Sequence, residues 1–170
     1  MRRGRGGNMI LEAAMWMPVF FLLIVGMLQV GKITYLYYTL KKTEYTAARY
    51  LSVQSGVNFC PDAIASDPNV QAAIQFALTG TTDGSGPLII PSLTPDMLQV
   101  VTECIDPATG LPGPCDAGGC NTGSPMGAQR PDYIVVTIPN GYPVQPRIPF
   151  LLLDPIPLKP TVAVPFGGTS

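Results

Sequence analysis

The sequence predicts an α+β protein. It has a long amino-terminal transmembrane helix that extends out of the membrane, then a small exported domain with one short helix and a mainly antiparallel sheet, stapled by disulfides. Three observations lead to this prediction. An apolar run covers residues 9–28 of the 170-residue chain. Short segments rich in β-branched residues, separated by proline and glycine, occupy the second half. All four cysteines lie beyond the apolar run.

The apolar run is long enough to cross a bilayer. Between Met9 and Leu28 the only ionisable side chain is Glu12, and roughly 20 apolar residues span the hydrocarbon core. A carboxylate at that depth costs about 3 kcal/mol on insertion scales, so a partner for Glu12 is expected. The alternative is a side chain that snorkels to the headgroups or inserts in its protonated form. Pro18 lacks a backbone donor and is expected to bend the helix.

Charge distribution predicts the orientation. The stub of residues 1–7 carries three arginines, and residues 50–129 contain no lysine or arginine. Positive residues hold a loop in the cytoplasm, so the stub stays inside and the carboxyl-terminal bulk is exported, although Lys32, Lys41 and Lys42 oppose this asymmetry. The prediction is a single-pass protein of the cytoplasmic (inner) membrane.

A cleavable secretory signal peptide shares the basic start and the apolar core. It requires small residues at a cleavage site after that core. The candidates near Gly26 and Gly31 stand among larger side chains and match the A-x-A pattern poorly. The run is therefore interpreted as a retained anchor.

The helix is predicted to continue beyond the membrane. From Lys32 to Ser55 there is no proline or glycine, and apolar residues recur at three-and-four spacing with one charged interruption, Glu44. A helix over residues 8–55 would be about 70 Å long at 1.5 Å per residue. Its outer half is expected to pack on partner helices, on its own exported domain, or on each with a different face.

The exported domain is assigned to residues 56–170, after Gly56. Asp67 and Pro68 predict a helix start, and Gly80 predicts its end. The expected buried stripe of this second helix is Val70, Ala73, Ile74, Ala77 and Leu78.

Three strands are predicted over residues 97–105, 133–138 and 161–166, because each is apolar or β-branched and is bounded by Pro, Gly or Asp. The sequence Pro-Asn-Gly at 139–141 predicts a turn. Proline at every third position in residues 143–149 excludes a central strand and favours an edge strand or a polyproline segment.

Two segments are interpreted as loops that add little to the core, residues 79–91 and the flexible loop 106–131, which are rich in Gly, Pro and Ser. Loops of this length are functional or mobile. The second one is therefore either a contact surface outside the membrane or a tolerated insertion.

The four cysteines, Cys60, Cys104, Cys115 and Cys120, predict two disulfides with three possible connectivities. Four small residues separate Cys115 from Cys120, which favours a local closure there and leaves Cys60 to join Cys104. A four-cysteine zinc site is the alternative, but the C-x2-C spacing is missing. The compartment into which the domain is expected to be exported is oxidising, which favours disulfides.

Composition argues against catalysis and against nucleic-acid binding. The chain has no histidine, and its exported acids are scattered, so neither an acid–base pair, a metal site nor a cofactor site is predicted. The net charge is −1, and loss of the three arginines of residues 1–7 would change it to −4. An acidic exterior does not favour nucleic acid.

One further pattern concerns the amino terminus. A basic leader ends in Gly7, Glu12 follows five residues later, Pro18 lies six residues beyond it, and the helix reaches an Ala-Ala-Arg sequence within residues 46–50. This arrangement resembles the type IV pilin signal and, more narrowly, the TadE-like pseudopilins of tight-adherence (Flp) pilus systems. The resemblance covers residues 1–55.

The resemblance implies that a prepilin peptidase cleaves between Gly7 and Asn8, which divides the chain into a leader (1–7), an assembly helix (8–55) and the exported domain (56–170). It implies that Glu12 sets the register of assembly by pairing with a neighbouring subunit's terminal amine. The implied partners are other pilin subunits, the prepilin peptidase, the inner-membrane assembly platform and membrane lipid, and the exported protein would enter an extracellular pilus.

The expected function is that of a minor pseudopilin in pilus assembly. The alternative is an uncleaved, membrane-tethered binding or adhesion module whose specificity lies in the loop 106–131.

Overall fold

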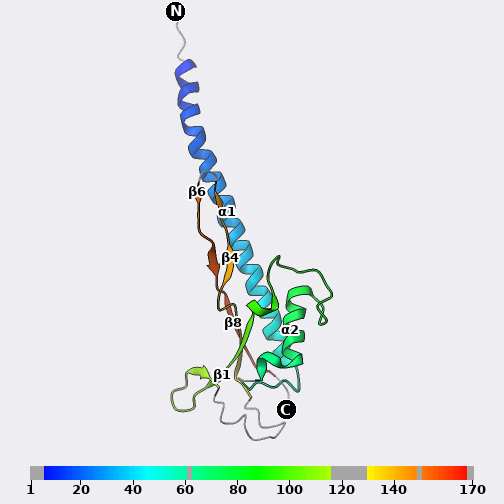
Figure 1. The fold of residues 1–170 in the computed structure, drawn as a ribbon. Coiled ribbons are helices and arrows are strands. Elements are labelled where there is room, and N and C mark those ends of the chain that lie inside the picture. Colours follow the sequence, from blue (N-terminus) through cyan, green and yellow to red (C-terminus); the bar gives the residue numbers. More distant parts are fainter. Residues whose placement is uncertain (1–5, 61–62, 116–129, 149–150, 168–170) are drawn as a thin grey trace, which may run out of the picture.

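The computed structural model describes residues 6–60, 63–115, 130–148 and 151–167. Figure 1 shows a long helix with a small α+β domain packed along its carboxyl-terminal half. The elements are α1 (Gly6–Val53), η1 (Ile64–Ser66), α2 (Pro68–Thr79), η2 (Pro95–Met97), β1 (Gln99–Ile105), β2 (Pro112–Pro114), β3 (Tyr133–Thr137), β4 (Tyr142–Val144), β5 (Arg147–Ile148), β6 (Leu151–Leu152), β7 (Ile156–Leu158) and β8 (Thr161–Pro165). The α+β class predicted from the sequence is confirmed.

Helix α1 is continuous over 48 residues and contains Pro18. It ends at Val53, two residues before the predicted Ser55, and Gly56 then adopts a φ of +77°, where glycine is favoured because it has no Cβ. The uninterrupted rod that the sequence predicts is therefore confirmed. The bend expected at Pro18 stays a prediction.

Helix α2 begins and ends where its sequence predicts. The carboxylate of Asp67 accepts a hydrogen bond from the backbone N–H of Asn69 at 2.8 Å, and Pro68 occupies the first turn. Gly80 closes the helix in the left-handed conformation, with a φ of +80°. All five residues of the predicted apolar stripe are buried, so this element is confirmed together with its core face.

The main sheet is antiparallel with the strand order β2-β1-β3-β8. In its register Val100 lies opposite Val136, and Ile134 lies opposite Val164. Alternate residues are buried in β1 and β8, whereas three consecutive residues of β3, 134–136, are buried. Of the predicted segment 97–105, the first residue belongs to η2 and the strand begins at Gln99, and the other two predicted strands form as β3 and β8.

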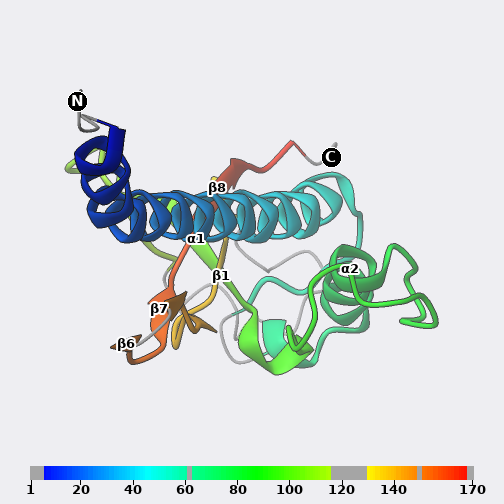
Figure 2. The ribbon, with the colours of Figure 1, turned by 90° about the horizontal axis from the view of Figure 1, so that it is seen from above.

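Helices α1 and α2 pack against each other, and α1 also packs against β3 and β8 (Figures 1 and 2). The core lies between these elements. It continues from the carboxyl-terminal half of α1 into α2 and the inner face of the sheet. The carboxyl-terminal half of α1 is therefore part of the core of the α+β domain.

The proline-rich region after the main turn forms small ribbons. Strand β4 pairs with β7, and β5 pairs with β6, both antiparallel. Gly141 occupies the predicted turn with a φ of +76°. The edge-strand interpretation of residues 143–149 is confirmed for the described part of that segment.

The structure corrects the interpretation of the two loops. Ile90, in the segment 79–91, is only 2% exposed and joins the core. The segment 106–131 contains β2, which pairs with β1, whereas its residues 116–129 lie outside the described part of the chain. Both errors have one physical reason. Whether a segment is buried or paired depends on contacts with strands or helices that are distant in sequence, and local composition does not reveal these contacts.

The predicted disulfide pairing is also wrong. Cys104 is bonded to Cys115, with their Cα atoms 4.9 Å apart. The pairing of β1 with β2 places Cys104 opposite Gly113 and so brings Cys115 close, which a count of residues between cysteines does not reveal. Cys60 is disulfide-bonded as well. Cys120 lies outside the described residues.

Candidate functional site

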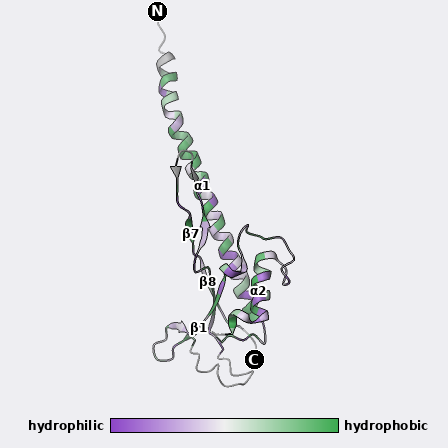
Figure 3. Ribbon diagram, viewed as in Figure 1, coloured by the Kyte–Doolittle hydropathy of each residue, from purple (hydrophilic) through white to green (hydrophobic). Residues whose placement is uncertain are grey.

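The candidate site is α1, whose two halves have different surroundings. In the amino-terminal half the large apolar side chains are exposed, for example Met9 at 77% and Met15 at 80%. This helix is the one element of the described residues that is long and apolar enough to cross a membrane, judged by length and composition. In Figure 3 the ribbon of this amino-terminal half, in which green marks the hydrophobic residues, extends away from the domain.

Glu12 lies on this exposed part of α1. The helix already includes Gly7 and Asn8. Asn8 precedes Glu12 by four residues, which is one helical turn and a rise of about 6 Å. The predicted cleavage position and the predicted pairing carboxylate therefore lie on adjacent turns of one continuous helix.

The carboxyl-terminal half of α1 has one face buried against the domain and other faces exposed. Leu40, Ala47 and Leu51 are fully buried against the domain. Tyrosines on other faces remain exposed, with Tyr35 at 74% and Tyr38 at 66%. Packing on the chain's own domain is thus confirmed for one face, and other faces of the same helix remain open along its length.

Glu44 is a residue to which the sequence analysis gave no role. It lies on the buried face of α1 and is 0% exposed. Neither Oε1 nor Oε2 has a hydrogen-bond partner among the described residues. Burial raises the pKa of this carboxyl from 4.5 to about 8, while the nearby positive charge of Lys41 acts weakly in the opposite direction.

A sequence signal for Glu44 did exist. It interrupts the apolar positions of α1 at the spacing that faces the core, and it lies sixteen residues beyond Leu28, about 24 Å along the helix axis. Glu44 is therefore outside the membrane-spanning segment that the sequence predicts over residues 9–28. An acid in such an apolar stripe indicates a buried, unpaired carboxyl only when the surface that packs against the helix is known to be apolar.

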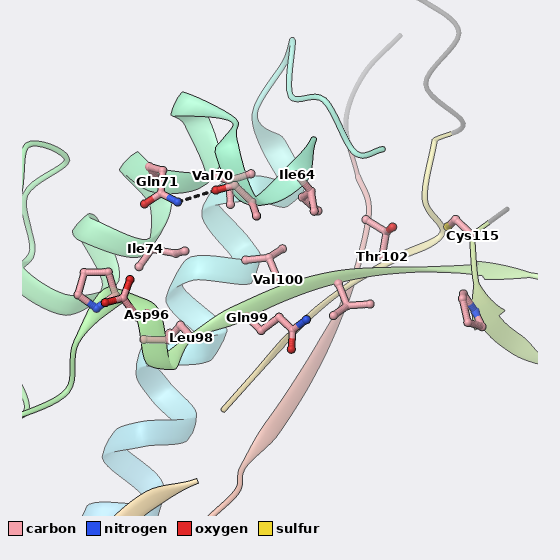
Figure 4. A pocket seen from close by; sticks show the side chains of 14 residues that line it. Ile64, Val70, Gln71, Ile74, Asp96, Leu98, Gln99, Val100, Thr102 and Cys115 are labelled. Carbon is pink, nitrogen blue, oxygen red and sulfur yellow. Dashed lines mark hydrogen bonds between the residues drawn. The ribbon is translucent and has the colours of Figure 1, made fainter. Parts of the chain in front are cut away.

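A second feature is a cavity of about 420 Å³ between η1, α2 and β1. Figure 4 shows Ile64, Val70 and Val100 around it, with the amide nitrogen of Gln71 donating to the carbonyl of Ala65 at 2.7 Å. Asp96 is the one ionisable side chain among the lining residues. This lining does not supply the paired groups that acid–base chemistry needs.

The acidic side chains of the α+β domain are scattered over the described part of the fold. Within the described ranges, no group of three or more His, Cys, Asp or Glu residues is arranged to hold a metal ion. Asp83 and Asp106 have pKa values lowered by hydrogen bonds within their own turns, from Ser85 and from Ala108. These carboxylates stabilise loops.

Comparison with known proteins adds a result for α1 alone. Residues 7–49 match the family model described as TadE-like protein. The match begins at Gly7 and includes Glu12 and Pro18. No curated protein and no solved structure matches the chain.

Proposed function

Because the amino-terminal helix is TadE-like over residues 7–49, we propose that this protein is a minor pseudopilin of a tight-adherence pilus. A prepilin peptidase cleaves it between Gly7 and Asn8. The mature helix then leaves the membrane and packs with the helices of other pilin subunits. The domain of residues 56–170 stays on the exported side.

The observation that carries the proposal is the division of α1 into two surfaces. Its amino-terminal half is apolar and exposed, with Glu12 on it, while its carboxyl-terminal half is built into the core of the domain. A helix held at one end in its own domain can present the other end to lipid first and to neighbouring helices later. An exposed apolar surface of this extent is expected to be buried, either in lipid or against neighbouring helices.

Glu12 gives the assembly its register. Cleavage creates an amine at Asn8, and in a helix bundle poor in water an ion is tolerated only when it is paired. The carboxylate of Glu12 pairs with the terminal amine of an adjacent subunit, so only axial positions that bring these groups together are stable. The uncleaved precursor has no amine at Asn8, so assembly requires cleavage.

The partners follow from this pathway. Membrane lipid covers the helix before assembly, and the prepilin peptidase meets the leader at the cytoplasmic face. The inner-membrane assembly platform extracts the cleaved helix, and other pilin subunits receive it. The protein is a single-pass inner-membrane protein before extraction and part of an extracellular fibre afterwards.

Mass spectrometry of the amino terminus tests the cleavage. Protein purified from cells that contain the matching peptidase should begin at Asn8, and a Gly7→Ala variant should retain Met1. An intact leader on the wild-type protein in such cells would contradict the proposal.

A charge-removal pair tests the role of Glu12. Glu12→Gln should abolish pilus assembly while the membrane level of the protein, measured by immunoblot, stays the same. The matched control is Glu103→Gln, the same change in β1 of the exported sheet, which should leave assembly intact. If fibres form normally with Glu12→Gln, the tethered binding module becomes the better account of this protein.

A further inference from the structure

Glu44 creates an electrostatic conflict at the contact between α1 and the exported domain. Its side chain is 0% exposed, and its neighbours on the same helix face, Leu40, Ala47 and Ala48, are fully buried with it. Its two carboxylate oxygens have no hydrogen-bond partner in the described part of the chain. A charged carboxylate in such a place would lack both water and a partner.

Few titratable residues lie on the elements packed against α1. These elements are α2, β3, β8 and β5. Helix α2 and strand β8 contain no titratable residue, β3 contains Tyr133, and β5 contains Arg147. On α1 itself the neighbouring groups are exposed, among them Lys41 and Lys42 one turn or less away.

We propose that Glu44 is a proton-controlled latch between the assembly helix and the exported domain. When its carboxyl is protonated, the domain closes on the outer half of α1. When it is ionised, the charge draws water into the contact and the domain loosens from the helix. The buried face of α1 around Leu40, Ala47 and Leu51 then becomes available to a partner helix.

The direction of the pH dependence follows from the carboxyl's two environments. Its pKa is about 8 in the closed state against the ordinary 4.5, so the closed state binds the proton more tightly. The stabilisation of the closed state is complete below about pH 4.5 and is lost as the pH rises through about 8. This inference does not depend on cleavage at Gly7, so the two proposals fail separately.

Hydrogen exchange of the full-length protein in detergent micelles tests the latch. Protection factors, which already correct for the intrinsic effect of pH on exchange, are measured for residues 40–52 and 68–79 from pH 5.5 to pH 8.5. In the wild type they should fall with rising pH, by at most tenfold per pH unit because one proton is linked to closure. A flat wild-type profile would overturn the proposal.

Three variants assign the effect to one side chain. Glu44→Gln cannot ionise and should give a flat profile, and Glu44→Leu should do the same while keeping the site apolar if the glutamine variant fails to fold. Glu103→Gln should retain the wild-type slope. A slope that persists in Glu44→Gln or Glu44→Leu would show that another group controls closure and would refute the latch.

Discussion

Asp67 connects helix α2 to the segment that follows α1. One carboxylate oxygen accepts the backbone N–H of Asn69 at 2.8 Å, and the other accepts the backbone N–H of Asn58, also at 2.8 Å. The side chain is only 8% exposed. A single residue therefore caps α2 and fixes the connection between the two helices.

We predict that Asp67→Ala destabilises α2 by about 2–3 kcal/mol. Loss of the helix cap contributes about 1 kcal/mol. The N–H of Asn58 then loses its acceptor, which costs a further 1–2 kcal/mol or so because this hydrogen bond is part-buried. Asp67→Asn keeps one carbonyl acceptor for the cap and should lose only about 1 kcal/mol.

Hydrogen exchange of peptides from residues 68–79 measures this loss in the intact protein. A change of 2–3 kcal/mol corresponds to exchange that is roughly 30- to 150-fold faster, since about 1.4 kcal/mol is tenfold. The control is Asp96→Ala, an exposed acid in η2, which should change α2 exchange little. If Asp67→Ala exchanges within about threefold of the wild type, the double role given to Asp67 is wrong.

Three further changes test other parts of the fold. Replacing Cys104 and Cys115 together by serine removes a bridge with a sequence separation of 11, so the exported domain should lose about 3 kcal/mol of stability in urea titration. Leu51→Ala, at a fully buried position of α1, should cost about 2–5 kcal/mol in the same titration. Gly141→Ala should loosen the β4–β7 ribbon, measured as faster exchange of residues 142–144, because φ is +76° and an added Cβ would lie 2.7 Å from the Cβ of Pro157.

Elements with local signals were predictable from sequence. Helix α2 needed only its cap at Asp67, its stop at Gly80 and its apolar period, and all three act within a few residues of the helix. The strands β3 and β8 follow from runs of β-branched residues between breakers. The apolar part of α1 is likewise a property of consecutive residues.

Features that depend on contacts between distant segments were not predictable. Composition placed Ile90 in a loop, but the fold buries it in the core. Counting residues between cysteines favoured the shortest closure, whereas the β1–β2 pairing brings Cys104 to Cys115. The same limit applies to Glu44, because its burial depends on the elements that pack against α1 and not on the sequence of α1 alone.

The sequence by itself determined the long helix, the position of Glu12 on an exposed apolar surface, and the α+β class of the exported domain. These depend on periodicity, charge and turn residues, which act over short distances along the chain. Only the tertiary structure decided that the outer half of α1 belongs to the core of the domain and that Glu44 is enclosed there without a partner. Burial is a property of both surfaces in a contact, and a single stretch of sequence specifies only one of them.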